Sequence, residues 1–391
     1  MVQNTNNAYR LDKNNIKSKK KKSDSEWNCP LPLSNFQFYE WFVGMTEGDG
    51  SFFIERQILK QNIKKEAKVK RTKEHESTDI LLPTVFHKQN DSNSLTEKAV
   101  RFKWVLGLKI ALSSYNYRAL AYIKTQLGIG TISSDSSSNM LQYRIRNRTH
   151  LSSHIFPIFD RFPMISAKHF DFLRVKEAYR VLENHLLDSN EKEAQLVQIY
   201  QSKKSHDPIP GGDRLFAPNN LPPVWEKALG SSRIKELKQD QFSSLRYDEA
   251  CKLITPYWLS GFSEADGSFY IVCKDRLNQR FCHGYGITQK SSPFVLKAIR
   301  ARLRIKQQIR HRVIPKSGSS FWSLDTTNNR VIQSISKLLC GKIRGMKAVE
   351  FRIWQRALNH KGDCDRLAKI QAQMRKLRSY RALLPIDTEK S

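Results

Sequence analysis

One stretch of twelve residues occurs twice in the chain, and this repeat constrains the fold more than any other feature. The first copy is Trp41–Phe52 and the second is Trp258–Phe269. Without a gap, the copies match in Trp, the first Gly, Glu, Asp, the next Gly, Ser and Phe, at an offset of 258 − 41 = 217 residues. A long ungapped match of this kind indicates a tandem duplication, so two related halves are expected.

Each copy predicts a short apolar helix that runs into a strand. Both helices carry small residues four positions apart: Gly44 with Gly48, and Gly261 with Ala265. Small side chains at this spacing share one helix face and allow a partner backbone to come close. Glycine inside a helix costs about 0.5–1 kcal/mol relative to alanine, and close packing is the natural compensation. We therefore expect these four residues to form the interface between the two helices.

Asp49 and Asp266 fall at the C-terminal ends of these helices, where the helix dipole and unpaired carbonyl groups disfavour an anion. Gly50 and Gly267 follow as expected helix caps. If the helices pack side by side, both carboxylates converge among carbonyl oxygens, a set of ligands suited to Mg²⁺ or Ca²⁺. The plainer alternative is an Asp-Gly turn that only ends a helix. Two copies in a basic chain favour the metal site.

The charge balance predicts a polyanionic partner. The 391 residues include 67 Lys and Arg against 37 Asp and Glu, a formal net charge of +30. Such a field favours nucleic acid. A basic ribosomal protein is the alternative, but 39% hydrophobic and 10% aromatic residues predict packed cores.

Cysteine usage and hydropathy limit the cellular compartments that fit this chain. The six cysteines form no CxxC pair, so zinc modules and a disulfide framework are not expected and a reducing compartment fits. No apolar run approaches the roughly 18–20 residues that span a bilayer. The N-terminus is polar, with a run at Lys19–Lys22 that we interpret as a solvated tail; a nuclear-localisation or DNA-contacting patch is the alternative.

The predicted elements repeat in order. In the first half we expect helices at 36–49, 115–127, 150–162 and 168–189, and strands at 51–56, 101–112, 129–133 and 140–147. In the second half we expect strands at 268–273, 284–289, 308–313 and 321–326, and helices at 294–304, 331–339 and 347–358. The resulting domains are a basic disordered tail at 1–35, a first half at 36–189 with an insertion at 57–99, a linker with local helices at 190–247, and a second half at 248–391 that ends in a basic helical tail.

Lys168 and Lys347 begin matching helices in the two halves. Their offset is 347 − 168 = 179, which is 38 less than 217, and the insertion at 57–99 accounts for most of this difference. The lysines therefore give a second register for the duplication. The alternative is that both are ordinary solvated helix residues.

At these residues the chain resembles the LAGLIDADG homing endonucleases of the monomeric, double-motif type. The motif is matched by Phe42–Gly50 and Leu259–Gly267, and the resemblance covers about 36–185 and 250–360. It implies an α+β fold of two pseudo-symmetric αββαββα halves, each with a four-stranded antiparallel saddle sheet, joined at the paired motif helices. The saddle straddles duplex DNA with its strands in the major groove.

The resemblance also implies a site. Asp49 and Asp266, with Gly48 and Ala265 beside them, bind two or more divalent ions, Mg²⁺ with Ca²⁺ or Mn²⁺ as substitutes. A pair of metal ions clamps the attacking and leaving oxygens of a phosphodiester. Lys168 and Lys347 stabilise the charge of the transition state. Gln289 positions water, and an alignment of Leu127 with Leu303 puts Ser113 at the corresponding place in the first half. Two cuts across the minor groove leave short 3′ overhangs.

Two further sets of residues receive roles. Glu47 and Glu264 lie on another face of each helix, and we expect them to bond across the helix pair or cap it instead of binding metal. Side chains that alternate along the strands read the DNA, with Arg144, Arg146 and Arg148 on one face. The DNA-binding candidates are Arg56, Arg101, Lys103, Lys109, Arg144, Arg146, Lys274, Arg276, Arg280, Arg310 and Arg312.

The main alternatives are binding proteins on the same fold. One is a maturase that binds group I intron RNA and assists splicing, and another is a repressor that binds DNA without cutting it. The presence of both aspartates favours the nuclease, because RNA binding does not need them. The resemblance further implies a monomer, without a membrane anchor, encoded by an intron in a mitochondrial or chloroplast genome, with a bacterial or archaeal origin as the alternative.

Overall fold

A computed structural model describes residues 35–58, 102–134, 139–202, 221–239, 244–275, 277, 280–290, 293–315 and 318–380. The predicted N-terminal tail and most of the predicted insertion at 57–99 lie outside the described residues.

The first half begins with the predicted motif helix, α1 (Phe36–Asp49). It continues through β1 (Gly50–Ile58), β2 (Phe102–Ser113), α2 (Tyr117–Leu127), β3 (Thr131–Ser134), β4 (Met140–Ile145), α3 (Arg148–His150), α4 (Phe156–Arg161), α5 (Lys168–Glu183) and α6 (Ser189–Gln201).

Two short helices, α7 (Pro223–Leu229) and α8 (Ser231–Gln239), precede the second half. The second half contains α9 (Tyr247–Leu253), α10 (Pro256–Asp266), β5 (Gly267–Asp275), β6 (Arg280–Gln289), α11 (Pro293–Arg302), β7 (Arg310–Val313), β8 (Ser320–Thr326), α12 (Asn329–Leu339), α13 (Lys347–Ala357) and α14 (Cys364–Ser379).

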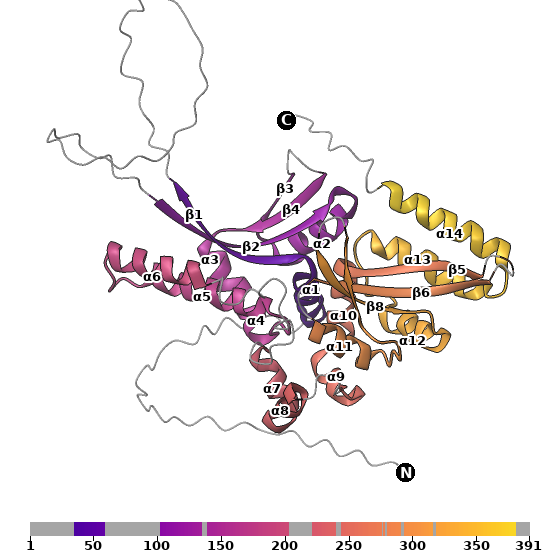
Figure 1. The fold of residues 1–391 in the computed structure, drawn as a ribbon. Coiled ribbons are helices and arrows are strands. Elements are labelled where there is room, and N and C mark those ends of the chain that lie inside the picture. The colour runs from indigo at the N-terminus through magenta and orange to yellow at the C-terminus, as the bar shows by residue number, and fades with distance from the viewer. Residues whose placement is uncertain are drawn as a thin grey trace, which may run out of the picture.

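Each half contains one four-stranded antiparallel sheet, which confirms the predicted α+β fold. The strand orders are β1-β2-β4-β3 and β5-β6-β8-β7, the same topology twice. The two sheets extend to opposite sides of α1 and α10, which lie together at the centre of the molecule (Figure 1).

Backbone atoms meet where α1 and α10 cross. A Cβ atom on Gly44 would overlap the carbonyl oxygen of Trp258, and one on Gly261 would overlap the carbonyl oxygen of Trp41. Further along, Gly48 lies against the Cβ of Ala265. The contact is reciprocal, since residues 217 apart exchange roles, and it places all four small residues of the predicted interface between the helices.

The strands alternate between a core face and an open face. Phe52 and Ile54 of β1 are buried, as are Leu106 and Leu108 of β2 opposite them. Phe269 and Ile271 are buried in the same way on β5. Because side chains alternate along a strand, the intervening residues lie on the other face, which we call the saddle face.

The beginning of the predicted linker is a helix that packs on the first half. Arg174 of α5 donates to the carbonyls of Ile199 and Tyr200 at 3.1 Å, and Trp104 of β2 donates to Glu193 of α6 at 2.5 Å. A capping box at Asp188 starts α6. This helix was predicted only as part of a connector.

The linker also contacts both halves through α7. The Trp225 side chain is fully buried, and its Nε1 donates to the carbonyl of Ile165 at 2.8 Å. Its ring centroid lies 6.2 Å from that of Phe294 in α11. One tryptophan therefore ties the loop before α5 to the second half.

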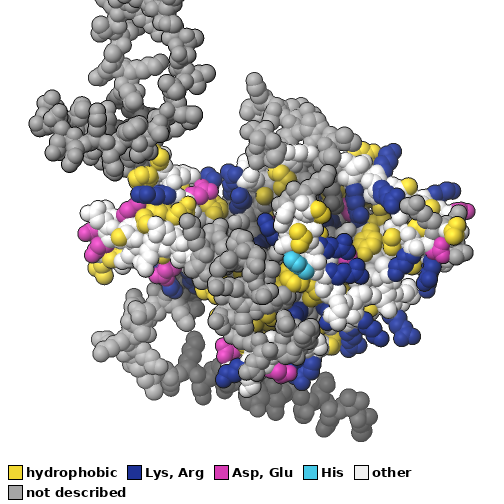
Figure 2. Space-filling view, in the orientation of Figure 1, with side chains coloured by type: hydrophobic (Ala, Val, Ile, Leu, Met, Phe, Trp, Pro, Cys, Tyr) yellow, Lys and Arg dark blue, Asp and Glu magenta, His cyan; other side chains and the backbone are white. Residues whose placement is uncertain are grey.

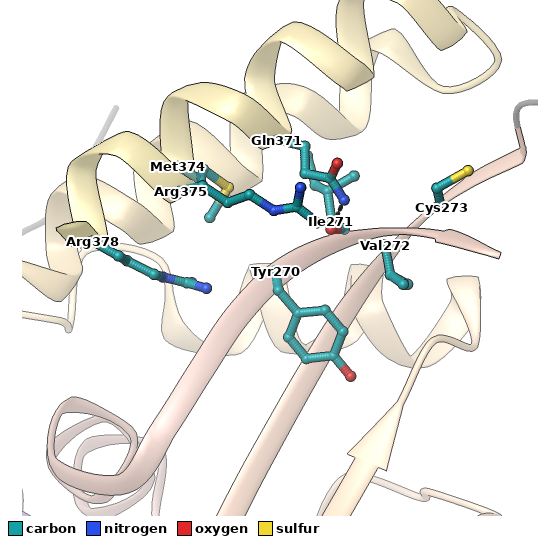
Figure 3. Close-up of a pocket in the computed structure, with 8 residues that line it drawn as sticks. All are labelled: Tyr270, Ile271, Val272, Cys273, Gln371, Met374, Arg375 and Arg378. Carbon is teal, nitrogen blue, oxygen red and sulfur yellow. Dashed lines mark hydrogen bonds between the residues drawn. The ribbon is translucent and has the colours of Figure 1, made fainter. Parts of the chain in front are cut away.

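The predicted basic helical tail is α14, and it docks on the edge strand β5. Gln371 donates to the carbonyl of Ile271 at 2.7 Å, and Arg378 donates to Glu350 of α13 at 2.9 Å. Figure 3 shows α14 lying over β5, with a cavity of about 540 Å³ between them. A helix in this position protects a strand edge from pairing with another chain.

Two strand predictions need correction. β4 ends at Ile145, so Arg146 and Arg148 do not continue its alternation, and Arg148 instead begins α3 behind the cap Asn147. β6 begins at Arg280, four residues before the predicted start at Gly284, because it pairs with the whole of β5. No helix within the described part of the chain is long and apolar enough to cross a membrane.

The reciprocal glycine contact generates a stability prediction. We expect Gly44→Val and Gly261→Val each to lower the free energy of unfolding by about 3 kcal/mol or more, because the new side chain meets a backbone carbonyl that cannot move aside. Urea unfolding followed by tryptophan fluorescence measures the loss. Ala372→Val on the exposed face of α14 is the control, with an expected cost of about 0.5 kcal/mol. Losses no larger than the control's would contradict the contact.

Candidate active site

Asp49 and Asp266 are the last residues of α1 and α10, so the helix contact brings their carboxylates together. Gly50 and Gly267 follow in extended conformations, with φ of −83° and −79°, and not in the left-handed conformation of a common glycine cap. Glycine is needed there for another reason. A Cβ on Gly50 would lie 2.6 Å from the carbonyl oxygen of Thr46, and one on Gly267 would lie 2.6 Å from that of Ser263.

Both aspartates lie in an environment that opposes their charge. Burial raises the pKa of Asp49 above its ordinary value. Burial, and then the charge of Asp49, raise the pKa of Asp266 to about 7. The second cause shows that the two carboxylates are close enough to repel each other, as expected for a shared ion site before the ion is bound.

A lysine ammonium group lies at the end of each motif helix. Lys168 Nζ donates to the carbonyls of Thr46 at 3.2 Å and Gly48 at 2.5 Å. Lys347 Nζ donates to those of Ser263 at 3.3 Å and Ala265 at 2.6 Å. Burial lowers the pKa of Lys168, and the charges of the surrounding carboxylates, Asp49 and Asp266 among them, oppose that shift. Neither lysine is an ordinary solvated residue.

Glu47 holds the loop from which Lys168 projects. Its carboxylate accepts hydrogen bonds from the backbone N–H groups of Ile165 and Ser166 and from the Ser166 hydroxyl. In return, Lys168 binds the carbonyls at the end of the Glu47 helix. We call this reciprocal arrangement the carboxylate–lysine clasp.

The second half repeats the clasp with Glu264 and Lys347. Glu264 accepts from the backbone N–H groups of Arg344 and Gly345 at 3.0 Å. It also accepts from Asn116 of the first half at 3.4 Å. Neither glutamate bonds to the other motif helix, so the predicted bond across the helix pair is not what they form.

Gln289 lies beside one aspartate only. Its side-chain amide donates to Asp266 Oδ2. Among the described residues, no hydrogen bond is made to the carboxylate of Asp49. The two acids therefore differ in their immediate surroundings although their helices match.

The strand register identifies the counterpart of Gln289. Gly50 pairs with Ile110 and Gly267 pairs with Ile287, an offset of 287 − 110 = 177 that relates Gln289 to Leu112. The predicted counterpart, Ser113, is off by one position. It came from aligning the helices that follow these strands, whose offset is 303 − 127 = 176, and the first half has one more residue between strand and helix than the second half. The side chain of Leu112 is buried and has no hydrogen-bond donor.

The donor set fits a hard divalent cation. In the part of the chain that the structure describes, no three His, Cys, Asp or Glu side chains gather around one point. Asp49 and Asp266 lie instead beside the carbonyls of Gly48 and Ala265, each of which accepts from a lysine and keeps a second lone pair. Mg²⁺ is typically held by one or two carboxylates together with waters and substrate phosphates, so this sparse oxygen set suits it.

Most of the predicted DNA-binding residues lie on the saddle face. Lys109 pairs with Arg144 across β2 and β4, and each lies one residue away from buried core positions, so both face away from the core. By the same alternation the saddle face carries Lys103, Lys109, Arg144, Lys274, Arg280, Arg310 and Arg312. Arg146, beyond β4, lies 4.0 Å from Glu55 and near the ring of Phe53, on the same side. In the view of Figure 2, Lys and Arg side chains gather over the second half, whereas Asp and Glu are more common around α6.

Arg56 is the exception, and its assignment as a DNA contact is corrected. It pairs with Trp104, on the core side of β1 and β2, and its guanidinium lies 2.6 Å from Glu193 of α6 and 3.6 Å from the ring centroid of Phe102. A strand position one residue off faces the opposite side of the sheet. Arg101 and Arg276 lie outside the described residues.

An aromatic–glycine pair on the saddle face escaped the sequence prediction. The ring of Phe53 lies over Gly107 on the neighbouring strand, and the ring of Tyr270 lies over Gly284. Phe53 and Tyr270 are 217 residues apart, and the glycines are 177 apart. The repeated offsets were the signal that could have revealed these pairs.

Comparison with known proteins identifies relatives of this chain. The family model described as LAGLIDADG endonuclease matches residues 84–179. "Probable intron-encoded endonuclease Cox1-I1b" of Schizosaccharomyces pombe is 30% identical over 348 residues, covering 88% of this chain and 70% of that protein. "Uncharacterized mitochondrial protein RF1" of Saccharomyces cerevisiae is 23% identical over 71% of this chain, which spans only 41% of that protein's length.

Solved structures share the fold. The meganuclease I-CpaMI bound to uncleaved DNA superposes with a TM-score of 0.55 at 18% identity, covering 87% of this chain and 98% of that one. The meganuclease I-SmaMI bound to uncleavable DNA gives a TM-score of 0.53 at 17% identity, covering 87% and 97%.

The raised pKa of Asp266 predicts an unusual pH dependence. A carboxyl whose folded pKa lies above its unfolded value is favourable at low pH, and its ionisation costs stability as pH rises from about 4 to 7. At pH 8 we expect the metal-free Asp266→Asn variant to have a higher Tm than the unaltered protein. The corresponding gain in the free energy of unfolding is at most roughly 4 kcal/mol, and near pH 4 the two proteins should have a similar Tm.

Thermal scans in EDTA at the two pH values measure this difference. Added Mg²⁺ should raise the Tm of the unaltered protein and leave that of the variant nearly unchanged, because a ligand stabilises the state that binds it. A variant that is less stable than the unaltered protein at pH 8 would refute the electrostatic strain.

Proposed function

The chain belongs to the LAGLIDADG endonuclease family, and on this premise we propose that it is a site-specific homing endonuclease. It makes a double-strand break in a long DNA target by metal-dependent hydrolysis, and the break promotes mobility of the intron that encodes it. The observation that carries the proposal is the convergence of Asp49 and Asp266 at the ends of two packed helices, each with a lysine from a matching helix beside it.

Asp49 and Asp266 would hold the divalent ions, with the Gly48 and Ala265 carbonyls beside them. When bound, such ions polarise the scissile phosphate and activate water for attack. Each acid comes from a different half, so the site serves both strands of a duplex that lies across the pseudo-twofold axis. The repulsion between the acids keeps them poised to take up positive charge.

Lys168 and Lys347 supply fixed positive charge. Their ammonium groups are held by carbonyls at the helix ends, so they need not reorganise as negative charge grows on the phosphate. The glutamates hold the loops that carry the lysines, which makes Glu47 and Glu264 positioning residues. Gln289 orients the carboxylate of Asp266.

The saddle face binds the DNA. Arginine contacts guanine bidentately, and lysine more often contacts phosphate, so Arg144, Arg310 and Arg312 are the candidates for reading bases. Lys103, Lys109, Lys274, Arg146 and Arg280 extend the positive face. A selection of cleaved sites from a randomised duplex library identifies the target.

One chain contains both acids and both lysines, so we propose that the monomer is active. Similarity to a yeast protein named as mitochondrial supports an organellar location. The similarity to endonucleases does not favour the alternative of intron RNA binding, which only rescue of splicing without DNA cleavage would support. No contact among the described residues favours RNA over DNA.

The first functional prediction concerns the acids. We expect Asp49→Asn and Asp266→Asn each to abolish double-strand cleavage, a loss of at least about 10³-fold, because each removes the charge that holds an ion. Plasmid linearisation in Mg²⁺ measures cleavage, and a gel shift in EDTA measures binding, which should change less than about threefold. Asp365→Asn, on exposed α14, is the matched control. Linearisation at the normal rate by either variant would refute the assignment of Asp49 and Asp266 as metal-binding acids.

The second prediction concerns strand asymmetry. We expect Gln289→Leu, which copies the first-half residue, to slow cutting of one strand by about 10–100-fold, the usual effect of removing a partner of a metal-binding carboxylate. The other strand should change less than about twofold. Denaturing gels with each strand labelled in turn show which strand is affected. Equal slowing of both strands would contradict a role confined to Asp266.

A further inference from the structure

A second cluster of cations lies in the second half, apart from the paired aspartates. It lines a cavity of about 510 Å³ between α9, the end of α11 and the beginning of α12. Its cations are Arg302, Arg304, Lys306 and Arg330, and Tyr247 forms part of the wall. The described residues that line the cavity include no Asp or Glu. We call it the Arg304 pocket.

Tyr247 orders two of the guanidinium groups. Arg304 lies 4.0 Å from the centroid of its ring and Arg302 lies 5.5 Å from it. Arg302 also donates to the Tyr247 hydroxyl at 3.3 Å and to the carbonyl of Ile254 at 3.1 Å. Stacking leaves the positive charge intact while it restricts the side chains, so the wall of the pocket is organised before any ligand arrives.

The backbone at Arg304 is strained. With φ of 54°, it is the one described residue other than glycine in the left-handed region. It lies in the turn two residues after the end of α11, where its N–H donates to the carbonyl of Ala301 and the N–H of Ile305 donates to that of Arg300. Glycine usually occupies this position because a Cβ is disfavoured there. A residue kept in spite of such strain points to a function.

The first half shows what the fold requires at the same positions. There α2 ends at Leu127 and is capped by Gly128, with φ of 68°. Segments 126–130 and 302–306 share Leu and Ile at their second and fourth positions, at an offset of 304 − 128 = 176. The other three positions hold Gln126, Gly128 and Gly130 in the first half and a cation each in the second. The fold therefore does not need these cations.

Arg330 repeats this pattern. Asn147 and Asn328 cap the following helix in each half, at an offset of 328 − 147 = 181. Two residues after each cap, the first half has Thr149 and the second has Arg330. All four cations of the pocket are thus particular to the second half.

We propose that the Arg304 pocket binds backbone phosphates of the DNA duplex at the margin of the saddle, an inference that rests on the proposed function. Four cations, with no Asp or Glu among the described residues that line the cavity, suit phosphate oxygens. Lys306 precedes Arg310 by four residues, a span of at most about 14 Å. Arg310 begins β7, the edge strand whose arginines lie on the saddle face. Phosphate contacts of this kind fix the register and orientation of a protein on its duplex.

The test restores the first-half residues. The triple variant carries Arg304→Gly, Lys306→Gly and Arg330→Thr, and its charge-matched control removes three exposed cations elsewhere, with Lys337→Gln, Arg356→Gln and Lys369→Gln. Both are titrated with a labelled random-sequence duplex in EDTA over a range of KCl concentrations. Each phosphate contact contributes about 0.9 to the slope of log K against log salt, so the triple variant should lose about 2–3 from the slope. The control should keep the slope of the unaltered protein, and equal slopes for all three proteins would overturn the proposal.

Further measurements distinguish a phosphate-binding pocket from a purely structural cluster and from a site for a different ligand. Arg304→Gly alone should keep or raise the Tm, because glycine relaxes the strained position; a clear fall in Tm would identify a structural residue and overturn the proposal. The proposal would also be overturned if the triple variant lost slope in the salt titration with an RNA hairpin and not with the DNA duplex. It would be overturned as well if inorganic pyrophosphate raised the Tm of the unaltered protein while the triple variant kept the normal slope with the duplex. None of these readouts needs cleavage. If the protein binds duplex DNA through the Arg304 pocket but does not cut it, the proposed endonuclease function is refuted while the proposed phosphate binding by the pocket still holds.

Discussion

The close crossing of α1 and α10 is the contact on which the rest of the structure depends. Helix axes normally stay 8–10 Å apart because side chains fill the space between them. Here Gly44 lies against the carbonyl of Trp258, and Gly261 lies against that of Trp41. The approach is symmetric, so both helices end at the same level, and the acids at their ends meet. The mutual repulsion of Asp49 and Asp266 is a direct result of this geometry.

The carboxylate–lysine clasps connect the two motif helices to the helices that begin with Lys168 and Lys347. Each glutamate binds N–H groups before a lysine helix, and each lysine binds carbonyls at the end of a motif helix. Unpaired backbone groups of two different elements are therefore satisfied by one reciprocal exchange. A lysine held in this way cannot move independently of the aspartate beside it. The linker contributes too, because Trp225 binds the loop that Glu47 also holds.

Local pattern and the internal repeat predicted two related halves and the pair of acids from sequence. The bounds of α1, the order of elements in both halves and the place of Lys168 and Lys347 at the start of matching helices followed from periodicity and offset, whereas the four-stranded antiparallel sheets were implied by the resemblance to the family. What failed depended on contacts between distant segments. Arg56 was assigned to the wrong face because α6, its partner, was hidden in a connector-like stretch. Leu112 was missed as the counterpart of Gln289 because an alignment of helices cannot reveal a one-residue difference between strand and helix.

The raised pKa of Asp266 has a consequence for the lifetime of the protein in a cell. A metal-free molecule keeps two repelling acids where the motif helices cross, and under the proposed function the ion bound for catalysis would also relieve that repulsion. Proteases act on the fraction of molecules that is transiently unfolded, and this fraction falls when a ligand binds the folded state. Under that function, molecules without the ion would be degraded sooner. The amount of the protein in a cell would then follow the supply of the divalent ion.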